Sequence, residues 1–463
     1  MKCKLLILFV SLFFVELYSQ NEVMPNYTPP SPEASALTKY ANVEVNEFRG
    51  MINHNIPLYT YKAGLLELPI LLSYNGAGVL VDDVPTWVGI NWTLNAGGVI
   101  TRTVYDEIDE YANTRIFPTQ QEIEDYTLNA IDGTSNGQFL HNLASNGGVD
   151  SERDIFQFNF NGYSGSFYFD EEWNAKLIKD NQNLRIYIED RDDLYNNKFI
   201  YIITPDGVKY TFGGIDATED TSLRLVVDGS VIPNDSNLGT TSFYLKRIEH
   251  PTNGHIEFEY LNNLSQEILL TDEVYKISKV IEDMPDGMCC LKPEIPTINS
   301  LTTTSTRILN PIYLYKVRNF ENNENIIFNS NKVNNTSFRR GLNSIIVDKD
   351  LDLNNESFTR IEFKYTGITS ATNFFGNEIL NSSKRFFLTQ VKFNRAFQSN
   401  PNTKNEVFKF EYESPGGLPE RFSFSQDFGG YFNDISNTSA IPNNSFFNPF
   451  NQPNFADRTP NFS

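Results

Sequence analysis

Four short segments of this chain alternate aromatic or aliphatic residues with polar ones, and this period of two constrains the fold more than any other feature. The segments are FQFNF (156–160), IEFEY (256–260), IEFKY (361–365) and FKFEY (408–412). Successive side chains of a β-strand point to opposite faces of a sheet. Each segment is therefore predicted to be a strand with one buried face.

Turn residues between such segments predict hairpins. The segment 244–260 carries Asn253-Gly254 at its middle, which suits a type I′ turn because both central residues need positive φ. A similar turn is expected at Asp206-Gly207, and a longer Asn-rich loop is expected between 386–393 and 407–412. Aromatic residues make up 14% of the chain, which favours strands. The predicted fold class is all-β: a large, antiparallel, hairpin-rich sheet, either an open shell or sandwich-like.

One short helix is expected, over residues 119–131. Thr119 and Glu122 form a capping box at its start, and Gly133 follows its end. Ile123 and Tyr126 fall on one face of the predicted helix.

The N-terminus predicts export. Lys2 and Lys4 precede an uncharged apolar run, Leu5 to Val15, which is too short to span a bilayer as a mature helix. We expect a cleaved signal peptide and a secreted or cell-surface protein. The predicted organisation is a signal peptide (1–20), an extended leader (21–42), an N-terminal β region (43–260), a second β region of the same architecture (261–439) and an Asn/Pro/Phe-rich tail, expected to be disordered (440–463).

The formal net charge of −21 argues against some partners. Neutralising nucleic-acid phosphates requires clustered Lys and Arg, and docking to an anionic membrane surface has the same requirement. No later segment is apolar enough for a stable membrane span. Cys289 and Cys290 stand side by side in the mature chain, which gives no disulfide framework and a poor zinc site. A strained ring between them, pairing with another chain, and two reduced thiols all stay open.

The segment TWVGINWTLNAGGVITRT (86–103) contains no His, Cys, Asp or Glu. We interpret it as architectural: the two tryptophans would fill the core, and the paired glycines would allow a bend or bulge. A phosphate-binding loop would need a helix after the glycines, and no helical pattern follows Gly98. The predicted structural motif consists of Trp87, Gly89, Trp92, Gly97, Gly98 and Arg102.

Searches for catalytic and cofactor motifs favour a protein that is not an enzyme. No HExxH, Gly-x-Ser-x-Gly or Walker pattern occurs, so no catalytic residue, cofactor or resident metal is predicted. His250 and His255 flank the Asn253-Gly254 turn and are interpreted as exposed turn residues. YDEIDEY (105–111) could hold a carboxylate pair for glycoside hydrolysis, but a solvated face is the preferred interpretation.

Asp348, Asp350 and Asp352 alternate as the ligands of a calcium loop would. An EF-hand loop also requires Gly at its sixth position and Glu at its twelfth, where this chain has Leu353 and Thr359. The three aspartates are therefore weak calcium candidates. The alternative is an acidic edge strand or hairpin, whose charge would prevent edge pairing.

Several blocks of the chain, in order, resemble the N-terminal region of secreted Rhs (YD-repeat) proteins. The order of an IPL strand, an LSY strand, a tryptophan turn and ITR is also similar to the start of the virulence-plasmid B-type domain of toxin-complex B components, although Asn91 replaces the glycine usual before the second tryptophan. The resemblance spans nearly the whole mature chain. The resembling blocks are 30–50, 56–61, 66–104, 154–170, 203–213, 244–260, 385–393 and 425–443. The specific part of the resemblance is the block at 86–103.

The resemblance implies a structural role. In that family the region precedes YD repeats that coil a β-sheet into a hollow shell, and many members enclose a C-terminal toxin. We expect this chain to be a non-catalytic N-terminal portion that stops before the repeats, in a truncated or split gene, and its partners to be a downstream repeat shell or toxin segment. An extracellular glycan- or surface-binding β module is the alternative, and a secreted carboxylate hydrolase is a third hypothesis.

Overall fold

The structure is a computed structural model of the chain. It describes the following residues: 27–28, 31, 34, 52–76, 78–105, 108–111, 114–115, 121, 124, 149–150, 152–179, 182–189, 193–227, 230–231, 236–262, 267–280, 297–319, 324–332, 340–348, 359–368, 385–395, 406–413, 415–421, 423–437 and 457.

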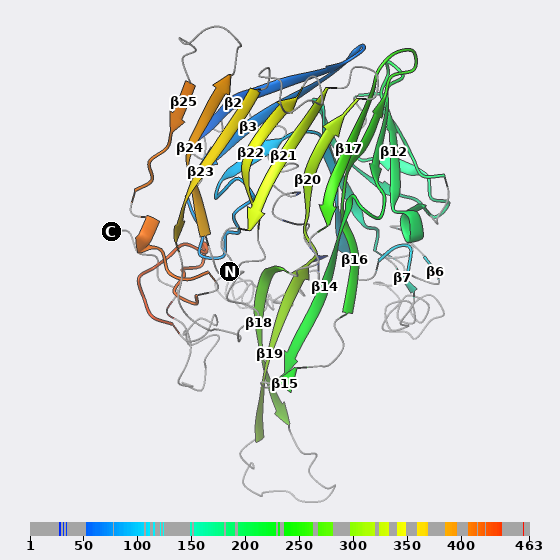
Figure 1. Cartoon of the computed structure of the whole chain (residues 1–463). Coiled ribbons are helices and arrows are strands. Elements are labelled where there is room, and N and C mark those ends of the chain that lie inside the picture. Colours follow the sequence, from blue (N-terminus) through cyan, green and yellow to red (C-terminus); the bar gives the residue numbers. More distant parts are fainter. Residues whose placement is uncertain are drawn as a thin grey trace, which may run out of the picture.

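Strands dominate the described residues, as the period of two predicts (Figure 1). The strands of the N-terminal half are β1 (Tyr27–Thr28), β2 (Ile52–Ala63), β3 (Leu66–Gly76), β4 (Trp92–Asn95), β5 (Gly98–Tyr105), β6 (Thr114–Arg115), β7 (Val149–Asp150), β8 (Ile155–Phe160), β9 (Tyr163–Phe169), β10 (Ala175–Leu177), β11 (Arg185–Tyr187), β12 (Phe199–Ile203), β13 (Lys209–Gly213), β14 (Thr218–Val227) and β15 (Ser230–Val231). Those of the C-terminal half are β16 (Ser236–Glu249), β17 (His255–Asn262), β18 (Glu267–Val280), β19 (Thr297–Leu309), β20 (Ile312–Arg318), β21 (Asn325–Lys332), β22 (Arg340–Asp348), β23 (Thr359–Ile368), β24 (Arg385–Arg395) and β25 (Glu406–Lys409). Two short helical turns are η3 (Asp193–Asn197) and η4 (Pro415–Gly417).

One long strand, β16, joins two ladders of strands. Its C-terminal part pairs with β13 and β17 in a ladder that runs β11-β12-β13-β16-β17-β20-β21-β22-β23-β24-β25. Its N-terminal part pairs with β14 on one side and β5 on the other, and β5 continues through β8 and β9 to β10. Every pairing among the described strands is antiparallel except that of β6 with β7.

A separate three-stranded sheet, β2-β3-β4, lies behind the strands β20 to β24 (Figure 1). Side chains join the two layers: the hydroxyl of Tyr61 donates to the backbone oxygen of Glu324 at 2.7 Å, and the hydroxyl of Tyr59 donates to the Glu324 carboxylate at 2.5 Å. The space between the layers is filled by one large apolar cluster, which includes Ile70, Leu72, Phe258, Phe328 and Val391. Burying this much aromatic and aliphatic surface is the main force that stabilises the fold.

The predicted fold class is confirmed, and the aromatic segments at 156–160, 256–260 and 361–365 are strands with alternating burial. In the fourth segment, β25 ends at Lys409, before the aromatic pair Phe410 and Tyr412. Most of the predicted helix at 119–131 lies outside the described residues. Within this range the structure describes Gln121 and Glu124, and both are helical. Within the expected leader, Tyr27 and Thr28 pair with β5.

The predicted two-residue turn at Asn253-Gly254 is wrong. β16 ends at Glu249 and β17 begins at His255, so the connection has five residues. Within it Gly254 has a positive φ of 121°, whereas Asn253 does not fall in that region. The amide of His250 donates to the Gly254 carbonyl at 3.0 Å and closes the longer loop.

Candidate functional site

Trp87 is the second residue of the 86–103 segment and is buried between the layers. Its ring lies 5.9 Å from that of Tyr313 on β20 and 6.3 Å from that of Phe328 on β21. Its backbone oxygen accepts a hydrogen bond of 2.8 Å from the amide of Leu342 on β22. The residue therefore holds an otherwise irregular segment against three strands that lie far away in the sequence.

A tight turn follows Trp87 and uses Gly89. The Gly89 amide donates to the Thr86 carbonyl at 3.0 Å, and its φ of 104° is in the region that favours glycine. A Cβ atom at this position would lie 3.0 Å from the backbone nitrogen of Leu388. The next residue, Ile90, donates its amide to the Phe386 carbonyl at 3.1 Å, so the turn contacts β24 directly.

Trp92 is the first residue of β4 and packs against two aromatic rings. The ring centroids of Tyr74 and Phe410 lie 4.9 Å and 4.5 Å away. Its indole Nε1 donates to the Tyr412 hydroxyl at 2.8 Å, and that hydroxyl donates to the Leu388 carbonyl at 2.7 Å. The predicted role of this tryptophan, a large apolar side chain with one satisfied N–H, agrees with this environment.

Gly97 and Gly98 allow close contact with neighbouring strands. A Cβ atom on Gly98 would lie 2.4 Å from the Cβ of Phe160 and 3.0 Å from the Asn159 carbonyl oxygen, a spacing that side chains do not tolerate. A Cβ atom on Gly97 would lie 3.1 Å from the ring of Phe258. Gly98 opens β5, and its residue pairs are in regular register with β8, so the glycines serve close approach and not a bulge in that ladder.

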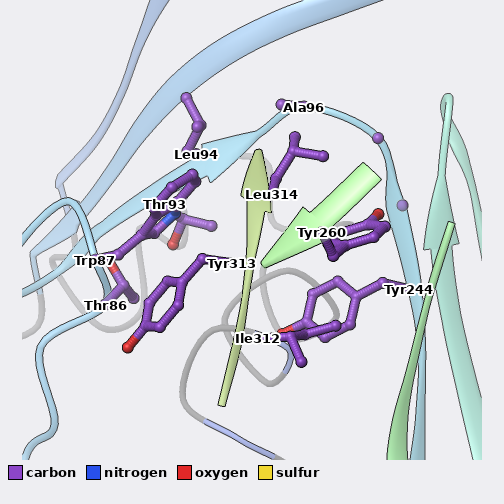
Figure 2. Close-up of a pocket in the computed structure, with 12 residues that line it drawn as sticks. Thr86, Trp87, Thr93, Leu94, Ala96, Tyr244, Tyr260, Ile312, Tyr313 and Leu314 are labelled. Carbon is purple, nitrogen blue, oxygen red and sulfur yellow. The ribbon is translucent and has the colours of Figure 1, made fainter. Parts of the chain in front are cut away.

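A small cavity of about 50 Å³ borders this segment (Figure 2). Trp87 and Tyr313 lie on one side of it, and Tyr244 and Tyr260 lie on the other. The hydroxyl of Tyr260 donates to the Leu245 carbonyl at 2.6 Å. Typical small-molecule sites have volumes of roughly 300–1,000 Å³, so we interpret this space as a packing gap that has room for a few water molecules.

Arg102, the last residue of the predicted motif, is fully buried in β5. Its Nε donates to Asp154 Oδ2 at 2.8 Å, and its two terminal nitrogens donate to the two carboxylate oxygens of Glu110 at 2.8 and 2.6 Å. The guanidinium lies 5.2 Å above the ring of Phe156, its partner in β8. A bidentate pair of this kind fixes both position and orientation.

The backbone also binds this cluster of Arg102, Asp109, Glu110 and Asp154, named the Arg102 cluster below. The amide of Tyr105 donates to Asp154 Oδ1 at 2.9 Å, and the amides of Asp109 and Asp154 each donate to the other residue's carboxylate, at 3.2 and 3.3 Å. These bonds attach the connection after β5 to the start of β8. Buried charges persist in proteins when they are paired and hydrogen-bonded in this way.

Burial and neighbouring charges shift the protonation equilibria of the Arg102 cluster. Burial disfavours the charged guanidinium, but Asp154 and Glu110 outweigh this effect and raise the pKa of Arg102. Burial raises the pKa of Asp154 to about 7, Arg102 opposes the rise, and Asp109 adds to it. Asp154 therefore titrates in the neutral range, far above an ordinary carboxyl group.

The interpretation of 105–111 as a solvated face is wrong for two of its residues. Asp109 is 0% exposed and Glu110 is 2% exposed. The cause is Arg102, whose buried positive charge requires carboxylate partners. The sequence signal was present, since Arg102 interrupts the apolar run of β5, but nothing local indicated Asp154, which lies 52 positions away.

The other candidate residues are not brought together. Asp348 ends β22 and is buried, and β22 lies between β21 and β23, so it is not an edge strand. Asp350, Asp352, Cys289 and Cys290 lie outside the described residues.

His250 accepts hydrogen bonds within its own loop, whereas His255 pairs with Glu257 at 3.2 Å. Within the described ranges no three His, Cys, Asp or Glu side chains are grouped to hold a metal ion.

In the part of the chain that the structure describes, no helix combines the length and apolarity needed to cross a membrane.

Comparisons with known proteins identify structural neighbours. No family model matches the chain, and no curated protein matches it. The crystal structure of TcdB2-TccC3 is similar over 80% of this chain and 16% of that chain, with a TM-score of 0.35 and 11% identity. The Photorhabdus luminescens Tc holotoxin pore is similar over 74% of this chain and 15% of that chain, with a TM-score of 0.32 and 11% identity. The N-terminal domain of effector protein SpvB from Salmonella typhimurium strain LT2 is similar over 77% of this chain and 99% of that chain, with a TM-score of 0.30 and 10% identity.

The chain therefore spans less than a fifth of the length of the two toxin-complex chains that it matches.

Proposed function

We propose that this chain is a secreted, non-catalytic structural module, the N-terminal portion of an Rhs/YD-repeat-type cell-surface or toxin-shell protein. The observation that carries the proposal is the open main sheet. Its ladder ends at β25, which pairs with β24 through four residue pairs and has no second strand partner within the described ranges. An unpaired strand edge is a template for a further strand.

The hydrogen-bonding pattern of β25 supports the proposal. The amide of Phe410 donates to the Thr389 carbonyl of β24 at 2.9 Å. Amides on one strand alternate in direction, so the amide of Phe408 also points toward β24, while those of Val407 and Lys409 point away from it. The side chain of Val407 is 42% exposed. The free side of β25 thus offers backbone groups beside an apolar side chain.

The chemistry of the 86–103 segment supports a role without catalysis. Its tryptophans and glycines serve contacts between layers, and Arg102 serves a closed, buried ion cluster. The carboxylates of Glu110 and Asp154 are committed to Arg102 and to backbone amides. The basic and apolar N-terminus (Lys2, Lys4 and Leu5–Val15) supports export. The ordered blocks that resemble Rhs proteins support the shell assignment.

Cross-linking of the protein in its producing cells tests the proposal. An amine-reactive cross-linker is added to culture supernatant and cell surface, the chain is purified through a tag, and cross-linked peptides are identified by mass spectrometry. Lys409 on β25 is expected to cross-link to a polypeptide that carries YD repeats, whether separate or continuous with the chain. The proposal would be contradicted if no YD-repeat polypeptide were cross-linked to Lys409. It would also be contradicted if the purified chain catalysed the turnover of a substrate.

A further inference from the structure

Four hairpin connections meet at one end of the molecule and form a groove there. They are the β2–β3 turn, the β8–β9 turn, the β12–β13 turn and the β16–β17 loop. The tip of β2–β3 and the β16–β17 loop lie side by side near the top of Figure 1, where the amide of Leu65 donates to the Asn253 carbonyl at 3.3 Å. The side-chain amide of Asn161 donates to the Tyr210 hydroxyl at 3.0 Å and joins the β8–β9 turn to β13.

These connections are closely packed and hydrogen-bonded. A Cβ atom on Gly254 would lie 2.4 Å from the Ala63 carbonyl oxygen, so the β16–β17 loop packs tightly on the β2–β3 tip. The Gly207 amide donates to the Thr204 carbonyl at 2.8 Å in the β12–β13 turn. Loops that a sheet scaffold fixes at one end are frequent positions for binding sites.

The groove between them has a volume of about 440 Å³. Leu66, Val208 and Tyr210 are buried and form its floor, while Leu65 and Pro69 are exposed at its rim. This volume falls within the range of small-ligand sites, roughly 300–1,000 Å³. It is far larger than the packing gap beside Trp87.

Polar groups surround this apolar floor. Asp206 accepts a hydrogen bond from the Thr204 hydroxyl through Oδ1, and Glu67 Oε1 lies 2.5 Å from Lys62 Nζ. Within the described ranges the second oxygen of each carboxylate has no hydrogen bond to the protein. His250 Nδ1 accepts from the amides of Thr252 and Asn253 at 3.2 and 3.3 Å, so its Nε2 carries the proton and can donate.

The residue types decide the ligand class. No Lys or Arg is among the residues that line the groove, and Lys62 beside it is paired with Glu67, which disfavours phosphate, sulfate and other anions. Acceptors (Asp206, Glu67) and donors (His250) stand around apolar contacts, which matches a ring that carries several hydroxyl groups and an apolar C–H face. A single basic side chain of a peptide would use the carboxylates but leave the donor and most of the groove unused. We propose that this groove binds a terminal sugar of a glycan.

This inference goes beyond the proposed shell role, and the two can fail separately. The full purified chain is applied to an array of defined oligosaccharides that end in a hexose, an N-acetylhexosamine or a deoxyhexose. A sugar that binds is then titrated in solution by calorimetry, as the free saccharide. We expect saturable binding, at least tenfold weaker binding for Asp206→Asn, and a smaller but measurable loss for Glu67→Gln.

The control is Asp216→Asn, which removes an exposed carboxylate that pairs with Lys246 away from the groove. Its affinity is expected to equal that of the wild type. Unfolding midpoints of all variants are measured, and Glu67→Gln decides the test if Asp206→Asn is less stable. Absence of binding to every sugar, equal affinity of both groove variants and the wild type, or binding of an oligolysine peptide alone would overturn the inference.

Discussion

The indole nitrogen of Trp92 lies 2.8 Å from the hydroxyl oxygen of Tyr412, and this hydrogen bond joins residues that are 320 positions apart. Tyr412 donates in turn to the Leu388 carbonyl of β24. The first strand after the tryptophan turn is thereby attached to the segment that follows β25. Burial raises the pKa of Tyr412 to about 12, so the hydroxyl keeps its proton at physiological pH.

Removal of this bond is expected to destabilise the fold modestly. Trp92→Phe keeps an aromatic ring but removes the donor, and Tyr412→Phe removes the acceptor. Each change should lower the free energy of unfolding by about 1–3 kcal/mol, since the bond is part-buried and Trp92 also loses ring volume. Chemical denaturation of both single variants and the double variant measures the coupling. Strictly additive losses would show that the two side chains do not interact.

A methyl group at position 98 is expected to destabilise the fold. In Gly98→Ala the added Cβ would overlap Phe160, so we expect a loss of about 1–3 kcal/mol in the free energy of unfolding. The control is Gly416→Ala, where no atom lies within 4 Å of the added Cβ and the φ angle is not positive. Thermal unfolding of the two variants should therefore differ clearly, and equal midpoints would contradict the close packing of β5 on β8.

The Arg102 cluster is expected to make stability depend on pH. The folded-state pKa of Asp154, about 7, exceeds its ordinary value near 3.8, so the folded protein holds a proton that the unfolded chain releases between these pH values. The stabilising contribution of Asp154 to the free energy of unfolding is therefore fully present below pH 4. It is lost as the pH rises toward 7, and the free energy of unfolding falls by at most about 1.4 kcal/mol per pH unit.

Asp154→Asn removes this titration. We expect its free energy of unfolding, measured by denaturant titration from pH 4.5 to 8, to lose the downward slope that the wild type shows over that interval. At pH 8, where the wild type has lost this contribution, the variant should be at least as stable as the wild type, because its neutral amide does not carry the burial cost of an ionised carboxylate. Parallel pH profiles for the two proteins would indicate that Asp154 is ionised throughout.

The free edge of β25 is expected to tolerate proline. Val407→Pro removes an amide that points away from β24, so the isolated chain should keep its stability within about 1 kcal/mol. The same change should abolish cross-linking of Lys409 to a YD-repeat polypeptide. Val407→Thr keeps the amide and should cross-link as the wild type does. A large loss of stability in Val407→Pro would mean that β25 already has a second partner.

Local patterns predicted the strands well, because alternation of side chains is a property of a few adjacent residues. FQFNF and IEFKY lie in β8 and β23 for that reason. Local patterns could not predict which distant strands pair. β5 lies between β8 and β16, and nothing in the sequence of β5 indicates either neighbour. The partners of Arg102 and the true length of the 250–254 loop were missed for the same reason, since both depend on tertiary contacts such as that of Gly254 with Ala63.

Hydrogen exchange at β25 tests the central claim most directly. Exchange rates of the Val407 and Lys409 amides are measured in the purified chain alone and in the chain bound to its YD-repeat polypeptide, with the inward amide of Phe408 as the internal reference. An open edge predicts fast exchange of both outward amides in the isolated chain, slower exchange of Phe408, and strong protection of all three on binding. Equal protection of outward and inward amides in the isolated chain, or no change on binding, would contradict the account.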